Sequence, residues 1–294
     1  MPLLNTVRFF WQHPLSRERP LAALERFVRW QFTSRLGFGP SVVPFVEDAH
    51  LIVSRGMSGA TANIYVGLHE YDDMAFLLHV LRPQDLFVDI GANIGSYTIL
   101  AAKGVGSRTI AIEPLPATYA HLENNIHYNR VGHLVDARNV GLAGKRGNLL
   151  FSADLDTTNH IVNETYAGPK VHVDVLPLDE LLADCEPFAI KIDVEGFERE
   201  VLAGGARALC RSTLQVVVIE VGEQLHREGQ PEKPVVEMLR EAGFASYTYD
   251  PRNRQVIATT EPSVVGNYIF VRDVAIVRER VSSARTYRVG PWSI

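Results

Sequence analysis

Two glycines and an acid gather where an apolar run ends. The stretch LFVDIGANIGSYT (86–98) carries Asp89 directly before a turn that contains Gly91 and Gly95. A strand, a glycine-rich turn and a helix form the nucleotide site of doubly wound sheets, whose ligands bind at the carboxyl ends of the strands. We expect the glycines to let the backbone approach a ligand, and the helix that begins near Ser96 to point unpaired N–H groups at it.

A second acid, Glu113, ends the next expected strand. It follows Gly91 by 22 residues, about where an acid meets ribose hydroxyls in a dinucleotide fold. NAD and S-adenosylmethionine both contain that ribose, so Glu113 does not separate them. The glycine turn does separate the two cofactors, because Gly91 and Gly95 are four residues apart and do not form the G-x-G-x-x-G motif of dinucleotide-binding folds. The Asp89 carboxylate would repel a diphosphate and attract an ammonium or sulfonium group. The sequence therefore predicts a cofactor that carries positive charge.

Strands and helices alternate around these residues. Strands are expected at 86–90, 108–113, 133–143, 188–193 and 214–221, and helices at 96–104, 116–129, 197–209 and 234–243. Segment 148–153 is expected to pair back on 133–143, and 244–250 with 267–273 to form a closing antiparallel pair. Strands that are apolar on both faces and alternate with helices indicate a parallel sheet covered on both sides.

Three blocks resemble the FkbM family of S-adenosylmethionine-dependent methyltransferases. They are VDIGANIGSYT (88–98), the pair Glu113-Pro114 and KIDVEGFEREVLAGG (191–205). The resemblance covers residues 85–225, and GATANIYVGLHEYDDMAFLLHVLRP (59–83) is similar to a common subgroup. It implies a class I α/β fold with a seven-stranded, mostly parallel sheet, an antiparallel last strand and helices on both faces. It also implies O-methylation, often of a sugar or a secondary metabolite.

The resemblance implies which residues bind S-adenosylmethionine. The methionine end would be bound by Asp89, Gly91, Asn93 and Gly95, with Ser96, Tyr97 and Thr98 beside them at the start of the helix. The ribose hydroxyls would be bound by Glu113, and the adenine would lie against Pro114 and Leu142.

The reacting end needs a group that helps to remove a hydroxyl proton. Asp193 ends the fourth central strand and Glu195 follows it, and we expect catalytic roles for both. His160, in the polar insertion DTTNHI (156–161), is a further candidate base because histidine titrates near neutral pH. Asn159 beside it, and Glu220 at the end of the fifth strand, are expected to bind the acceptor.

Structural alternatives exist for the two acids of the fourth motif. Asp193 could cap the helix that begins near Phe197, and Glu195 could add first-turn charge. Lys191 shares the strand face of Asp193, so we expect an ion pair between them. Two carboxylates could hold a divalent metal, but no third ligand is evident and no metal is predicted.

Composition limits the remaining possibilities for binding partners and cellular location. The chain has 294 residues, 46% of them hydrophobic, and a net charge of −5, which gives no reason to expect nucleic-acid binding. Cys185 and Cys210 are the two cysteines, so a reducing compartment is expected. No apolar run is long enough to span a membrane, and the N-terminus lacks a signal-peptide cleavage site. We therefore expect a cytoplasmic protein with a small-molecule or glycan acceptor.

The N-terminal part is expected to be an extension over 1–82, followed by the methyltransferase domain over 83–273 and a tail over 274–294. The extension should contain helices at 21–36 and 69–81, a β-hairpin from 42–46 and 51–54, and a strand at 63–66. One face of the first helix is apolar: Leu21, Leu24, Val28, Phe32 and Leu36. We expect this helix to pack on its own domain. The alternatives are weak contact with anionic lipid, because Arg26 and Arg29 lie off this face, and a role in an oligomer.

Two other functions compete with methyl transfer. One is an NAD-dependent oxidoreductase on a similar fold, which the turn spacing and Asp89 disfavour. The other is a non-catalytic cofactor-binding module, which the intact turn and both acidic motifs disfavour.

Overall fold

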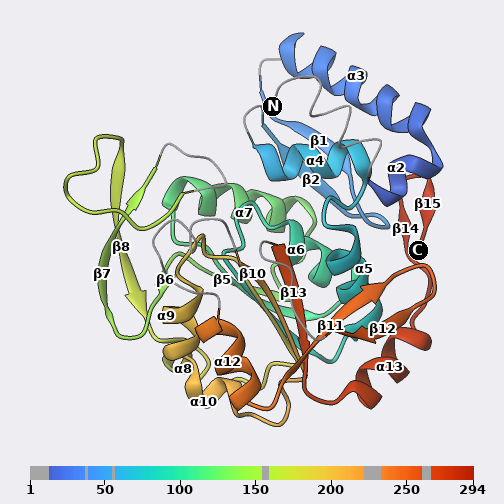
Figure 1. Cartoon of the computed structure of the whole chain (residues 1–294). Coiled ribbons are helices and arrows are strands. Elements are labelled where there is room, and N and C mark those ends of the chain that lie inside the picture. Colours follow the sequence, from blue (N-terminus) through green and yellow to red (C-terminus); the bar gives the residue numbers. More distant parts are fainter. Residues whose placement is uncertain (1–12, 37–38, 55–56, 154–158, 222–232, 260–265) are drawn as a thin grey trace.

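The computed structural model describes residues 13–36, 39–54, 57–153, 159–221, 233–259 and 266–294 (Figure 1). Within these ranges, no helix combines the length and the apolar character that crossing a bilayer requires.

One eight-stranded sheet organises the molecule. From edge to edge its strands are β12 (Gln255–Ala258), β11 (Ala245–Asp250), β13 (Gly266–Val271), β10 (Val216–Val221), β9 (Ala189–Ile192), β3 (Leu86–Ile90), β4 (Arg108–Ile112) and β5 (Val135–Arg138). The five strands from β5 to β10 are parallel, and β13 runs antiparallel to β10. This confirms the class I methyltransferase arrangement. The strand count differs from the predicted seven because the chain turns after Asp250 and adds β12 at the edge.

Helices cover both faces of the sheet, as expected (Figure 1). One face packs against α5 (Tyr71–Val80), α6 (Ser96–Ile99) with its π-helical continuation over Leu100–Val105, α7 (Pro116–Tyr128) and α13 (Val274–Ser282). The other packs against α8 (Leu178–Leu181), α9 (Glu198–Ala203), α10 (Ala206–Leu209) and α12 (Lys233–Glu241). Alternate residues of each strand enter opposite cores: Phe87 packs in the first and Val88 in the second. Both cores exclude water, which is why these strands are apolar throughout.

A smaller sheet corrects one prediction. Residues 133–143 do not form one strand, because the chain turns between β5 and β6 (Gly141–Leu142). At the turn, the Asn139 amide donates to the backbone carbonyls of Glu113 and Pro114. The strand β7 (Gly147–Ser152) therefore pairs with β8 (Lys170–Leu176), not with 133–143, in the order β6-β8-β7. In Figure 1 this sheet projects beside the main one.

The N-terminal extension lies over one end of the main sheet. Its elements are α2 (Pro14–Glu18), α3 (Pro20–Leu36), β1 (Ser41–Pro44), β2 (His50–Val53) and α4 (Ser58–Val66). The predicted hairpin is confirmed as β1–β2. The predicted strand at 63–66 is wrong, because these residues end α4. A short apolar run does not distinguish a strand from a buried helix turn, and here Tyr65 packs edge-on against Phe27 of α3.

The tail, which sequence patterns left unassigned, is ordered. Asp273 caps α13 by accepting from the N–H groups of Ala275 and Ile276. Further on, β14 (Arg288–Val289) pairs with β15 (Trp292–Ser293), and the Trp292 ring lies 4.2 Å from the Arg26 guanidinium of α3. Tail and extension are therefore packed together.

Helix α3 packs on its own domain, as expected, but not through Leu21, Leu24, Val28 and Phe32; the side chain of Leu36 lies outside the described part of the structure. The exposed fractions of Leu21, Leu24, Val28 and Phe32 are 80%, 47%, 53% and 67%. The helix instead buries the face that carries Ala23 and Trp30, with Phe27 between them. These three residues also follow helical spacing, and Trp30 has the largest side chain to remove from water.

Candidate active site

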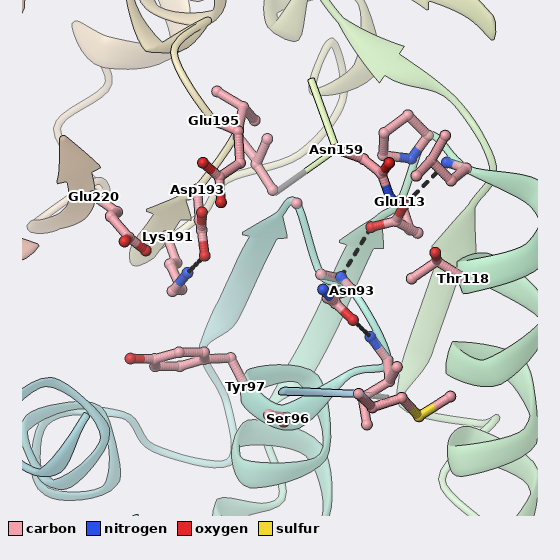
Figure 2. A pocket seen from close by; sticks show the side chains of 18 of the residues that line it. Asn93, Ser96, Tyr97, Glu113, Thr118, Asn159, Lys191, Asp193, Glu195 and Glu220 are labelled. Atoms are coloured by element: carbon pink, nitrogen blue, oxygen red, sulfur yellow. Dashed lines mark hydrogen bonds and ion pairs between the residues drawn. The ribbon is translucent and has the colours of Figure 1, made fainter. Parts of the chain in front are cut away.

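A cavity of about 660 Å³ lies at the carboxyl edge of the main sheet. Its floor comes from the carboxyl end of β10 and from the turns that follow β3, β4 and β9, and its upper wall comes from α3 and α4. In Figure 2, Glu113 and Asn159 lie on one side, and Lys191, Asp193, Glu195 and Glu220 group on the other. One cavity thus joins most of the expected cofactor residues to the acids expected at the reacting end.

The turn after β3 is held by its own hydrogen bonds. The N–H groups of Gly91 and Ala92 donate to the Ile112 carbonyl, and that of Gly95 donates to the Ala92 carbonyl. The Asn93 N–H donates to a Glu113 carboxylate oxygen at 2.9 Å, and the Ile94 N–H donates to the Asn93 side chain. All five N–H groups therefore have protein partners. A pyrophosphate cradle would need such groups free.

The reason for glycine at position 91 also differs from the expectation. A Cβ atom built on Gly91 would lie 1.7 Å from the Asp193 carbonyl oxygen, and the residue has φ +77°. The close approach is thus made by the end of β9, not by a ligand. The turn keeps left-handed conformations at Asn93 and Gly95 as well, with φ +52° and +94°. This conformation holds Asn93 at the cavity wall.

Glu113 is a buried carboxylate at the end of β4, with 5% of its surface exposed. Its two oxygens accept from the N–H groups of Asn93 and Leu115, at 2.9 and 3.0 Å. Burial raises the pKa of Glu113 to about 7, and the two N–H donors oppose that rise. Because each carboxylate oxygen has a second lone pair, Glu113 can still accept from two hydroxyl groups in the cavity.

The other expected cofactor residues divide into two sets. The cavity wall includes Gly91, Asn93, Ser96, Tyr97, Glu113, Pro114 and Leu142. Asp89, Gly95 and Thr98 are not among the described residues that line it. Asp89 is 1% exposed and accepts from the Thr98 hydroxyl at 2.6 Å, while its strand neighbour across the sheet is Lys191. Burial raises the pKa of Asp89 to about 6, and Lys191 opposes the rise. Direct contact of Asp89 with a cofactor stays a prediction.

An ion pair lies beneath the acids on the side of the cavity where the reaction is expected. The Lys191 ammonium, 2% exposed, lies 2.8 Å from a carboxylate oxygen of Asp193 and 4.6 Å from the centre of the Tyr97 ring. This confirms the expected pair. Burial lowers the pKa of Lys191, but Asp193, Glu70 and Asp89 together raise it above its ordinary value. The lysine is thus a fixed positive charge under a group of acids.

The carboxyl groups of Glu195 and Glu220, near this ion pair, have pKa values above the ordinary value for glutamate. Burial raises the pKa of Glu195 to about 7, with a further rise from Asp193 and Glu198. Burial, Asp193 and Glu70 also raise the pKa of Glu220. Both structural alternatives for the fourth motif fail. The N-cap of α9 is Phe197, without a side-chain cap, and the acids of its first turn are Glu198 and Glu200.

Glu70 is a wall residue that sequence reasoning missed. It precedes α5, and its carboxylate accepts from the Tyr97 hydroxyl at 2.6 Å and from the Asn267 amide at 3.0 Å. Burial alone would raise the pKa of Glu70, but His69, Lys191 and these two donors lower it below its ordinary value. The acids at the start of the predicted helix 69–81 could have indicated it, but they indicate a helix start equally well.

The apolar upper wall of the cavity was likewise not predicted from the sequence. Phe27 and Trp30 of α3, and Met57 and Tyr65 at α4, line the cavity opposite the acids. The Gln31 amide donates to the Tyr65 hydroxyl at 3.2 Å and ties the two helices together. The cavity therefore offers aromatic surface above and carboxylates below.

The polar insertion contributes less than expected. Asn159 and Ile161 line the cavity, with Ile161 bridged to Phe151 of β7. His160 is not among the described lining residues, and its backbone N–H and C=O bond to Ser152. Its catalytic role stays a prediction. Within the described ranges, no group of three His, Cys, Asp or Glu side chains is placed to hold a metal ion.

The residues present fit S-adenosylmethionine. Glu113 suits ribose hydroxyls, Pro114 and Leu142 give apolar surface for an adenine, and the acids near Tyr97 suit a cationic methionine end. They do not fit a dinucleotide, because the N–H groups of 91–95 are already used.

Comparisons with known proteins agree with this geometry. The family model for the methyltransferase FkbM domain matches residues 89–246, more than half of the chain. The chain is 28% identical over 180 residues to the hexuronic acid methyltransferase AglP of Haloferax volcanii, covering 60% of this chain and 70% of that protein. It is 28% identical over 234 residues to the 31-O-demethyl-FK506 methyltransferase FkbM of Streptomyces tacrolimicus, covering 68% and 84%.

Among solved structures, the chain is similar to a methyltransferase FkbM from Methylobacillus flagellatus KT. The identity is 16% and the TM-score 0.44, with 89% of this chain and 60% of that chain covered.

The family match confirms the expected methyltransferase activity and its methyl donor, S-adenosylmethionine. Because the family model matches more than half of it, the chain belongs to the FkbM family of methyltransferases.

Proposed function

We propose that this protein is an O-methyltransferase that modifies a hydroxyl group of a sugar. The single observation that carries the proposal is the shared cavity, in which Glu113 faces one half and Asp193, Glu195 and Glu220 face the other. A hydroxyl group bound among the acids would lie next to the methionine end of a cofactor whose ribose is held by Glu113.

The walls of the acceptor half support a sugar. Sugars present hydroxyl groups at their edges and C–H groups on their faces. The carboxylates of Glu70, Glu195 and Glu220 accept hydrogen bonds from hydroxyl groups, and the aromatic rings of Trp30 and Tyr65 offer apolar surface to a ring face. One relative is named for a hexuronic acid and another for O-demethyl-FK506, so hydroxylated acceptors occur within the family.

When bound, S-adenosylmethionine supplies an electrophilic methyl group on a sulfonium. The residues of this chain then have to orient an acceptor oxygen and remove its proton. Asp193, fixed by Lys191 at 2.8 Å, accepts a hydrogen bond from a neighbouring hydroxyl of the sugar and so orients the ring, which leaves the single hydrogen of the reacting hydroxyl for another acid. One of the two acids Glu195 and Glu220 takes that proton as the oxygen bonds to the methyl carbon and the carbon–sulfur bond breaks, because their raised pKa values make them stronger bases, once ionised, than ordinary carboxylates. Their position beside the cavity also lets the proton leave to solvent.

Label transfer tests the proposal. The protein is incubated with methyl-labelled S-adenosylmethionine and a panel of neutral glycosides, the matching uronic acids and non-sugar alcohols. We expect labelled methyl ethers of glycosides, which survive mild alkali, whereas methyl esters of a carboxylate do not. Label only in alkali-labile esters, or only in non-sugar alcohols, would contradict O-methylation of a sugar.

Two competing functions predict different results. A dinucleotide enzyme would be stabilised against heat by NAD more than by S-adenosylhomocysteine, and we expect the reverse. A non-catalytic module would bind S-adenosylhomocysteine but release no labelled product with any acceptor in the panel.

A further inference from the structure

The exposed side of α3 has a stripe of apolar residues that the methyl-transfer site does not use. Leu21, Leu24, Val28 and Phe32 follow one another at intervals of three or four residues, so they lie on one face of the helix. They point away from the face that Ala23 and Trp30 bury. In Figure 1, α3 lies at the outer edge of the molecule, with α4 on its inner side. We call these four residues the α3 stripe.

The size of the α3 stripe argues against a second protein copy as its partner. From Leu21 to Phe32 the helix advances about 17 Å, and a helix is about 10 Å wide, so the stripe offers on the order of 200 Å². A stable protein interface buries about 800 Å² on each partner. A bilayer surface has no such requirement, because a helix can lie in it with only its apolar face inserted.

The charge around the stripe fits an anionic surface. Residues 14–36 contain five arginines and two glutamates, a net charge of +3, although the whole chain carries −5. Arg17 precedes the stripe and Arg35 follows it, and both side chains are exposed. Positive charges that flank an apolar helix face attract the phosphate groups of anionic lipids.

We propose that the α3 stripe docks on a membrane surface that contains anionic phospholipid, with α3 lying in the plane of the interface. This inference does not depend on the identity of the acceptor. Since Phe27, Trp30, Gln31 and Ser34 of the same helix line the cavity, docking brings the cavity close to the bilayer. An acceptor carried by a lipid would then reach the site without leaving the membrane.

Vesicle flotation tests the proposal with the full chain. The probes are vesicles of phosphatidylcholine alone and of phosphatidylcholine with phosphatidylglycerol. We expect wild-type protein to float with the anionic vesicles, less so in high salt, and weakly or not at all with the neutral ones. The double variant Leu21→Asp/Phe32→Asp should bind at least about tenfold more weakly, because two charges would enter the apolar layer. Arg17→Gln/Arg35→Gln should weaken binding to the anionic vesicles.

The matched control is Ile257→Asp, which alters an exposed apolar residue of β12 (48% exposed) outside the stripe. It should float like the wild type. If the aspartate pair does not fold, judged by circular dichroism, Leu24→Ser/Val28→Ser replaces it. The proposal is overturned if wild-type protein ignores anionic vesicles, or if the stripe variants bind as well as Ile257→Asp. A dimer that sedimentation shows to dissociate in the stripe variants, without vesicle binding, would assign the stripe to a second copy instead.

Discussion

Replacing Glu113 by Gln removes one negative charge from the centre of the proposed cofactor site while keeping the side-chain shape. The carboxylate accepts from the N–H groups of Asn93 and Leu115. A glutamine offers one acceptor oxygen, so it loses a charge-assisted bond to a ribose hydroxyl and leaves one N–H without its acceptor. A hydrogen bond to a charged group contributes about 1.5–3 kcal/mol. We therefore expect S-adenosylhomocysteine to bind about 10- to 100-fold more weakly.

The pH dependence sharpens this prediction. Burial raises the pKa of Glu113 to about 7, so at lower pH the carboxyl is protonated and one oxygen is occupied as a donor. The affinity of wild-type protein for S-adenosylhomocysteine should increase as pH rises through 7, because ionisation restores the acceptor. The Gln variant should show no such increase. Isothermal titration calorimetry at several pH values measures both effects.

A matched control separates loss of binding from loss of structure. Asp179 also accepts two backbone N–H groups, from Arg207 and Ala208, but it lies outside the described cavity wall. Asp179→Asn should lower thermal stability and leave the affinity for S-adenosylhomocysteine unchanged. A folded Glu113→Gln variant that binds like the wild type at every pH would refute the assignment of Glu113 to the ribose.

Three further predictions follow from the site. Asp193→Asn should keep the affinity for S-adenosylhomocysteine but lower turnover about 100-fold in the label-transfer assay, and an unchanged rate would remove this residue from the mechanism. Turnover should rise with pH between about 7 and about 8, because Glu195 and Glu220, whose pKa values are raised to about 7 and about 8, act as bases only when ionised. Glu220→Gln should flatten that profile, and an unaltered profile would exclude it as a base. Gly91→Ala should destabilise the protein by about 2–4 kcal/mol in thermal unfolding, because its Cβ would strike the Asp193 carbonyl. Gly266→Ala is the control, since its φ is also positive but no atom lies within 4 Å, and an equal loss in both would mean that only backbone strain matters.

The sequence by itself determined the central layers and the main chemistry. Apolar runs that alternate with amphipathic segments predict a covered parallel sheet, and the structure confirms that sheet in class I order. The ends of β3, β4, β9 and β10 carry Gly91, Glu113, Asp193 and Glu220, and all four line one cavity. This could be predicted because the carboxyl ends of parallel strands meet at one edge.

The tertiary structure decided which groups reach that cavity. Asp89 and Thr98 belong to the same motif as Asn93, yet they bond to each other behind the wall because the strand and helix turn them inward. Glu70 and Tyr97 are far apart along the chain, and their hydrogen bond depends on how α5 packs beside the π-helical continuation of α6.

The orientation of α3 is the clearest case of a feature that local sequence patterns do not predict. Two faces of this helix have apolar residues at helical spacing, and periodicity ranks neither of them. The helix buries the face with Trp30 and leaves the one with Leu21 and Phe32 in solvent. Local spacing determines that a helix forms, because its hydrogen bonds are local. Which face it buries depends on the surfaces that distant segments such as α4 and the tail present to it, and those exist only in the folded chain.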